Sequence, residues 1–213
     1  MKWSLSSLSV FEKCQLKYKL QYIDKLPTPR GAAASRGVEN HKIFEDRIAG
    51  TLPTLPVEYN YYEQLANEVI EKKGQPEYKV SFRKDWEPCT WNDPDVWYRG
   101  ILDVLVPGPD AWIIDWKTGK IYPDHDDQKH LYATAVLSGH SDVRRVRAEH
   151  IYIDLGKRRE KTFDRDELRG MQQHWEARAK FLDLTAPEDM VPSPGMHCRW
   201  CPFSAKAGGP CRF

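Results

Sequence analysis

Two strand-like segments joined by a turn-forming run constrain the fold more than any other feature of the sequence. The segments VWYRGILDVLV, at 96–106, and AWIIDWKTG, at 111–119, are rich in β-branched and aromatic residues, which favour extended backbone. Pro107-Gly108-Pro109-Asp110 lies between them, and such a run is typical of a hairpin turn. The sequence therefore predicts an antiparallel pair of strands near the middle of the chain.

The predicted hairpin brings three charged side chains together. Pairing about the turn places Asp103 nearly opposite Asp115, and the two-residue period of a strand puts Lys117 on the face of Asp115. Two carboxylates on adjacent strands repel each other and lose hydration unless a cation lies between them. Oxygen ligands favour Mg²⁺ or Mn²⁺, and a histidine such as His41 tilts the preference towards Mn²⁺. The alternative is an ordinary hairpin whose acids are solvated and form a salt bridge.

Apolar periodicity outlines the other elements. Spacings of three, four and seven residues predict helices, and the segments that show them are 5–23, 36–48, 60–73, 127–137 and 168–182. In the second of these helices we expect Val38, Phe44 and Ile48 to face the core. A period of two predicts further strands at 77–83 and 146–155.

Charge gives two opposing indications about nucleic acid. The chain carries 32 lysines and arginines against 31 aspartates and glutamates, a formal net charge of +1, which argues against a nucleic-acid-binding protein because phosphate binding depends on Lys and Arg. Residues 1–30, however, hold six basic and two acidic side chains, and residues 196–213 hold three basic side chains and no acid. The excess acid lies in the middle of the chain, where a bound metal would neutralise part of it.

The sequence also indicates a compartment. No apolar run approaches the roughly 20 residues of a spanning helix, and the start MKWSLSSLSV lacks the apolar core of a signal peptide. We therefore expect a cytoplasmic protein with no membrane partner. Its 40% hydrophobic residues suit one compact domain.

The cysteines are distributed unevenly. Cys14 and Cys89 stand alone, whereas Cys198, Cys201 and Cys211 crowd the last sixteen residues. In a chain without an export signal, ligation of a metal or a cluster is a better expectation than disulfides. The alternative is a set of loose thiols in a flexible tail.

Four short motifs follow one another in a fixed order. They are G-x-x-x-H at Gly37–His41, G-x-x-D at Gly100–Asp103, D-x-K at Asp115–Lys117 and Q-x-x-x-Y at Gln128–Tyr132. Together they resemble the PD-(D/E)XK nuclease superfamily, specifically its RecB-like branch. The opening SLSSLSVFEKC, followed by Tyr18 and Tyr22, is similar to the N-terminal helix of the iron-sulfur members, which include CRISPR-adaptation nucleases and phage exonucleases.

The resemblance implies an α/β fold, with a central mixed β-sheet flanked by helices as in restriction endonucleases. It also implies roles for individual residues: His41, Asp103, Asp115 and the main-chain carbonyl of Trp116 as ligands of Mg²⁺ or Mn²⁺, Lys117 as the catalytic lysine, and Gln128 and Tyr132 as residues that hold the DNA strand or orient the lysine. Glu77 and Glu45 are second-rank candidates near the metal. Judged alone, His41 is more typical of a core histidine.

For the cysteines, the resemblance implies a [4Fe-4S] cluster. Its ligands would be Cys14, Cys198, Cys201 and Cys211, so that the tail 196–213 packs on the N-terminal helix within a single domain, 1–213. The gap between Cys201 and Cys211 is longer than relatives usually have, and a four-cysteine zinc site remains an alternative. Cys89 is interpreted as structural.

The expected function is therefore that of a metal-dependent DNA exonuclease acting on DNA ends or single strands. A water activated by the metal would attack the phosphodiester. A small nuclease of this kind resembles a phage protein, which would act in the host cytoplasm. The alternative is a DNA-binding or assembly protein of the same fold whose catalytic activity is vestigial.

Two further features have a bearing on DNA. The basic residues at 144, 145, 147, 157, 158, 159 and 161 could follow phosphates, although a charge run is usually a solvated face. Eight tryptophans, among them Trp91, Trp97, Trp116 and Trp200, offer stacking surfaces for bases, although core packing is the default for most of them.

Overall fold

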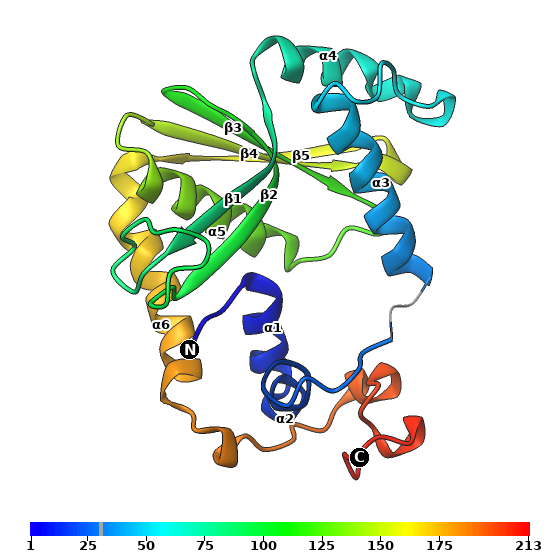
Figure 1. Ribbon diagram of the computed structural model, residues 1–213, viewed down its shortest axis with the longest axis vertical. Coiled ribbons are helices and arrows are strands. Elements are labelled where there is room, and N and C mark those ends of the chain that lie inside the picture. Colours follow the sequence, from blue (N-terminus) through cyan, green and yellow to red (C-terminus); the bar gives the residue numbers. More distant parts are fainter. Residues whose placement is uncertain (30–31) are drawn as a thin grey trace. The chain divides into compact units, whose positions relative to one another are not determined.

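The computed structural model describes residues 1–29 and 32–213 (Figure 1). The chain divides into two compact units, one formed by Met1–Gly31 with Trp175–Phe213 and the other by Ala32–His174. Helix α6, Leu168–Leu184, begins in the second unit and ends in the first. No helix in the described part of the chain combines the length and the apolar character needed to cross a membrane.

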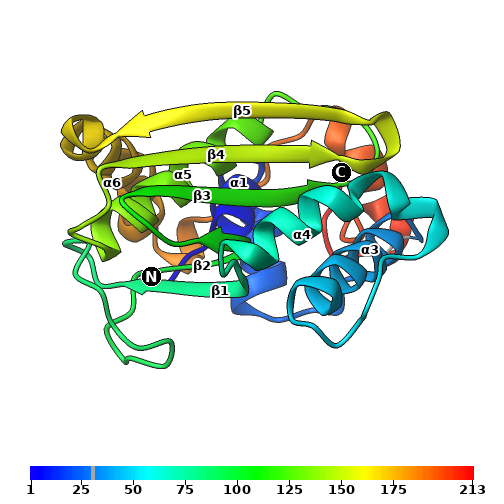
Figure 2. The same ribbon diagram turned by 90° about the horizontal axis from the view of Figure 1, so that it is seen from above.

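The larger unit is built on a five-stranded sheet in the order β1-β2-β3-β4-β5 (Figure 2). The strands are β1 (Gln75–Phe82), β2 (Tyr98–Val106), β3 (Asp110–Lys117), β4 (Arg145–Tyr152) and β5 (Lys157–Asp164). β3 and β4 run parallel, and the other neighbours run antiparallel. The predicted mixed sheet of an α/β fold is therefore confirmed, as is the hairpin that joins β2 to β3.

One face of the sheet packs against α3 (Ala32–Ile48) and α4 (Glu63–Glu71), the latter preceded by a 3₁₀ turn at Val57–Tyr62. The core on this face includes Phe44, whose ring stacks on Trp116 with centroids 4.0 Å apart. Ile48 is buried as expected, but Val38 is 56% exposed. The expectation for Val38 was wrong because its side chain borders an open pocket and not the packed core.

The opposite face of the sheet carries α5, His125–Gly139. Directly paired residues on neighbouring strands point to the same face, and Asp115 pairs with His150, so both lie on this side. Side chains of α5 bond to it, since Gln128 contacts Asp115 and His125 contacts Tyr152. We call this face, which bears Asp115, the site face.

The sequence did not predict β5. Its residues KRREKTFD are almost all polar, and the alternation that predicted a strand at 146–155 ends at Tyr152, where a 3₁₀ turn at Ile153–Leu155 begins. Gly156, at φ +59°, then reverses the chain. β5 is held mainly by backbone pairing with β4 at the edge of the sheet, so its sequence lacks the apolar signature of a buried strand.

The smaller unit begins with three short helical elements where one helix over 5–23 was expected. They are α1 (Leu5–Lys13), α2 (Gln15–Tyr18) and a π-helical turn at Lys19–Ile23. Cys14 adopts an extended conformation between the first two. The helix breaks there even though the apolar spacing continues, because that spacing records which side is buried and not whether the backbone is continuous.

Candidate active site

Three acidic residues lie in one row across β1, β2 and β3, at the point where backbone pairing is interrupted. The β1–β2 ladder joins Pro76 to Val104 and Tyr78 to Leu102, and it omits Glu77 and Asp103 between them. The β2–β3 pairs end at Val104 and Ile114, one residue before Asp103 and Asp115. This is the register that the hairpin predicted.

The side chain of Asp103 accepts a backbone hydrogen bond from β3 where the pairing between β2 and β3 has ended. Its Oδ2 accepts a hydrogen bond of 2.8 Å from the backbone N–H of Trp116 and lies 3.1 Å from Nδ1 of His41. Desolvation lowers the pKa of His41, but the hydrogen bond to Asp103 and the charges of Asp103 and Asp115 outweigh it, so the pKa lies above its ordinary value. Asp103 thus connects α3 to β3.

Asp115, Lys117 and Gln128 form a closed set of polar contacts. Nε2 of Gln128 donates to Oδ1 of Asp115 over 2.8 Å, and Nζ of Lys117 donates to Oε1 of Gln128 over 2.5 Å. Lys117 also forms an ion pair with Oδ2 of Asp115. Asp115 is only 2% exposed, so the ion pair with Lys117 and the hydrogen bond from Gln128 stand in for much of the hydration that this carboxylate loses.

Glu45 of α3 lies near Glu77, the β1 member of this row. Together with His41, Gly37, Val38 and Lys42 they line an open pocket of about 460 Å³. Glu77 has φ +49°, a left-handed conformation that is unusual for a glutamate. Desolvation, followed by the charges of Asp103 and Glu45, raises the pKa of Glu77.

Tyr132 follows Gln128 by one helical turn. Burial, followed by the charge of Asp115, raises the pKa of Tyr132 well above its usual range, against a smaller opposing effect of its hydrogen bond with Gln128. The phenol therefore keeps its proton at neutral pH. The structure thus brings Tyr132 to the same group as Gln128.

The two motif glycines, Gly37 and Gly100, differ in whether the surrounding atoms leave room for a side chain. A Cβ atom at Gly100 would lie 2.4 Å from the hydroxyl of Tyr98 and 3.2 Å from Cγ2 of Val80, so a side chain does not fit there. A Cβ atom at Gly37 would lie 3.6 Å from Oγ1 of Thr118, an ordinary contact. Packing thus explains the glycine of G-x-x-D but not that of G-x-x-x-H.

His125 belongs to this group of residues but was not predicted from the sequence. Its Nδ1 lies 2.9 Å from the hydroxyl of Tyr152, and burial, followed by the charge of Lys117, lowers its pKa. Tyr152 pairs with Lys117 across β3 and β4. The only signal in the sequence is its position three residues before Gln128, which lies one helical turn away on the same side of α5.

The residue types at this site suit a metal ion, but their side chains are not already arranged around one position. Among the described residues, no three His, Cys, Asp or Glu side chains are arranged to hold an ion. Asp103 and Asp115 offer hard oxygen ligands. Oδ2 of Asp115 is buried, and within the described part of the chain it has no hydrogen-bond donor besides the Lys117 ammonium in its ion pair. A divalent cation could take these oxygens as ligands.

In the smaller unit, four of the five cysteines meet at one pocket. Cys14, Cys198, Cys201 and Cys211 all line it, together with Lys17 and His197. The backbone of the tail folds back to bring them there: the N–H of Cys211 bonds to the carbonyl of Phe203, and the N–H of Leu16 bonds to that of Val191. Cys89, in the larger unit, is not among the residues that line this pocket.

The tryptophans are mostly core residues. Trp97 and Trp116 are 5% and 1% exposed, so neither presents a ring to a base. Trp200, in the smaller unit, is 76% exposed, so its ring is accessible.

Comparisons with known proteins agree with this geometry. A family model described as the PD-(D/E)XK nuclease superfamily matches residues 2–205. No curated protein gives a match. A Eubacterium rectale protein described as "Putative exonuclease" aligns with a TM-score of 0.59 and 14% identity, over 94% of this chain and 86% of that one; this likeness shows a shared fold. SSO0001 aligns over 93% of this chain and 96% of its own with 13% identity, but its TM-score of 0.37 is too low to indicate a shared fold.

Proposed function

The chain belongs to the PD-(D/E)XK nuclease superfamily, and from this premise we propose that it hydrolyses the phosphodiester backbone of DNA with Mg²⁺ or Mn²⁺. The preferred form of the activity is exonucleolytic, on DNA ends or single strands. Within the superfamily, the order of its motifs resembles the RecB-like branch. We also propose that the protein is of phage origin and acts in the host cytoplasm.

The observation that carries the proposal is the set of contacts among Asp115, Lys117 and Gln128. The carboxylate and the amide both accept from the ammonium of Lys117, so the cation is held in one place before substrate arrives. A fixed ammonium stabilises the transition state most strongly where negative charge develops on the phosphate oxygens. Gln128 links the lysine to α5, which makes it a positioning residue.

The acids supply the metal ligands in this proposal. Asp103 and Asp115 would hold the ion with His41 and the main-chain carbonyl of Trp116, and Glu77 and Glu45 border the open pocket beside them. The ion, when bound, supplies Lewis-acid stabilisation of the phosphate. The N–H of Trp116 orients Asp103, and His41 holds the other side of that carboxylate.

Tyr132 completes the polar group. Because its pKa is raised, its hydroxyl is a neutral donor at physiological pH. We propose that it donates to the DNA strand or to Gln128, which would keep the amide oriented so that its oxygen faces Lys117.

Digestion of labelled DNA tests the proposal. Linear single strands labelled at the 5′ or the 3′ end, and circular single strands, are incubated with the protein and Mn²⁺. An exonuclease degrades the linear strands and leaves the circles intact. Cleavage of circles would show an endonuclease, and no cleavage of any substrate would favour the alternative, a DNA-binding protein with vestigial catalysis.

A second proposal concerns the cysteine pocket. We propose that Cys14, Cys198, Cys201 and Cys211 ligate a [4Fe-4S] cluster, with zinc as the alternative, and that 1–213 works as one nuclease domain. The support is that all four thiols line a single pocket although Cys198 follows Cys14 by 184 positions in the sequence. Four thiolates suit either a cluster or zinc. A crosslink of that span would stabilise the fold by about 5 kcal/mol in the loop-entropy model.

A further inference from the structure

The β4–β5 pair carries basic side chains on both of its faces, and the two faces differ in whether these side chains have acidic partners. Successive residues of a strand point to opposite sides. Arg158 therefore faces away from Arg159 and Lys157 on β5. We call the side opposite the site face the tryptophan face, because Trp112 and Trp116 lie on it.

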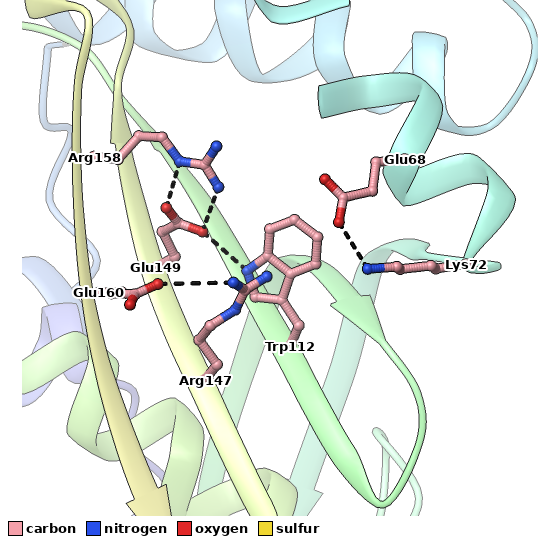
Figure 3. Close-up of polar contacts among 7 residues, drawn as sticks. All are labelled: Glu68, Lys72, Trp112, Arg147, Glu149, Arg158 and Glu160. Atoms are coloured by element: carbon pink, nitrogen blue, oxygen red, sulfur yellow. Dashed lines mark hydrogen bonds and ion pairs between the residues drawn. The ribbon is translucent and has the colours of Figure 1, made fainter. Parts of the chain in front are cut away.

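On the tryptophan face, every arginine of the two strands has an acidic partner (Figure 3). Nη2 of Arg158 donates to Glu149 over 2.9 Å, and Glu149 also accepts from the indole N–H of Trp112 over 3.1 Å. Arg147 lies 3.8 Å from Glu160. Beyond the group drawn in Figure 3, the remaining arginine, Arg145, donates to Asp164 over 2.7 Å.

On the site face, the cations of β5 have no such partner. The register sets three rows across the sheet, Lys117–Tyr152–Lys157, Asp115–His150–Arg159 and Ile113–Ala148–Lys161. In each row the β4 residue next to the cation is a tyrosine, a histidine or an alanine, so no carboxylate faces Lys157, Arg159 or Lys161 from β4. Two of the rows end at Asp115 and Lys117 of the candidate site.

The three cations are exposed, and none forms an ion pair within the described part of the chain. Lys161 lies over the ring of Phe163 at 5.2 Å. Asp126 of α5 lies close enough for the charges of Lys161 and Arg159 to lower its pKa, but its ion-pair partner is the buried Lys129 at 2.8 Å. An exposed row of cations without direct acidic partners attracts a polyanion.

We propose that Lys157, Arg159 and Lys161 form a phosphate track that holds a single DNA strand and leads it to Asp115 and Lys117. Alternate residues of a strand lie about 7 Å apart, and β3 lies two strand spacings, about 10 Å, from β5. The track therefore lies within a few nucleotides of the site. This inference rests on the proposed function, which supplies DNA as the ligand.

A matched pair of double variants tests the track. Arg159→Gln/Lys161→Gln removes two charges from the site face, and Arg145→Gln/Arg147→Gln removes two from the tryptophan face of the same strands. Binding of a fluorescent dT20 strand is measured in EDTA by anisotropy, from 50 to 300 mM salt, and thermal unfolding checks that both variants fold.

The track predicts that the site-face variant binds roughly 10-fold more weakly at 0.1 M salt and that its salt slope falls by about 1.4, because each phosphate contact in single strands contributes about 0.7. The tryptophan-face variant should bind within about twofold of the wild type. Equal weakening of both variants, or no weakening of the first, overturns the track. The binding assay in EDTA is independent of cleavage, which is measured separately with Mn²⁺. Wild-type protein that binds the strand in EDTA but does not cleave it with Mn²⁺ would contradict the proposed function and leave the track intact.

Discussion

Nε2 of Gln128 donates a 2.8 Å hydrogen bond to Oδ1 of Asp115, and the opposite atom of the same amide accepts from Lys117. One side chain of α5 thus orients both a carboxylate and an ammonium of β3. An amide can do this because its two ends have opposite hydrogen-bonding character.

The first prediction follows from this arrangement. Gln128→Glu should lower the rate of DNA cleavage about 10-fold or more, because the new carboxylate cannot donate to Asp115 and repels it, and supporting residues of this kind are typically worth 10–100-fold. DNA binding in EDTA should be unchanged. Gln173→Glu, a substitution of the same type on α6, is the control. Full activity in Gln128→Glu would show that the amide does not position the site.

The second prediction concerns the buried carboxylate of Glu149. Glu149 is 2% exposed and its ion-pair partner is Arg158, whose side chain is 47% exposed. Arg158→Ala should lower the free energy of unfolding by about 1–3 kcal/mol, less than for a fully buried pair because water reaches the arginine. Chemical denaturation measures it. Arg145→Ala, which breaks an exposed pair with Asp164, should have a clearly smaller effect because solvent screens that pair. Equal losses in both variants would be evidence against a special role for Glu149.

The third prediction is a dependence of stability on pH. Burial lowers the pKa of His150 from 6.5 to about 3, against a smaller opposing effect of Asp115. A histidine whose folded pKa is depressed stabilises the fold fully above 6.5, and this stability is lost as the pH falls from 6.5 towards 3. The free energy of unfolding should therefore decrease as the pH falls below 6.5. His150 should contribute up to about 1.4 kcal/mol per pH unit to this decrease. The His150→Gln variant should show a shallower slope between pH 6 and 4; identical slopes would contradict the assignment.

The fourth prediction distinguishes the occupants of the cysteine pocket. Protein purified without oxygen should be brown and contain iron and sulfide, and Cys14→Ser should remove the colour. Cys89→Ser, outside the pocket, should leave the colour unchanged. Colourless protein with one stoichiometric zinc would support the zinc alternative, and protein with neither metal would contradict both.

Much of the fold could be predicted because its core strands are marked by apolar and β-branched residues. The turn at Pro107–Asp110 predicts the hairpin register, and with it the position of Asp103 beside Asp115. β5 was missed because an edge strand held by backbone pairing carries no apolar signature. The same omission hid the division of basic residues between two faces, since a face exists only once a strand has been assigned.

The site was predictable in its residue types but not in its contacts. The D-x-K spacing put Lys117 on the face of Asp115, and the motif resemblance implied that Gln128 orients the lysine. Nothing in the sequence indicated that the same amide would also donate to Asp115 or that His125 would bond to Tyr152. Those contacts depend on how α5 packs on the sheet, which is a tertiary property. Similarly, the break at Cys14 depends on the backbone and not on apolar spacing.

The most direct test of the account is cleavage of end-labelled single-stranded DNA by wild-type protein, Lys117→Met and Asp142→Asn, with Mn²⁺ present. Asp142 is an exposed acid outside the site. The account predicts rapid cleavage by wild type and by Asp142→Asn, and a rate at least about 100-fold lower for Lys117→Met, because a single fixed charge of this kind is typically worth 10²–10³ in rate. Equal rates for all three proteins would contradict it.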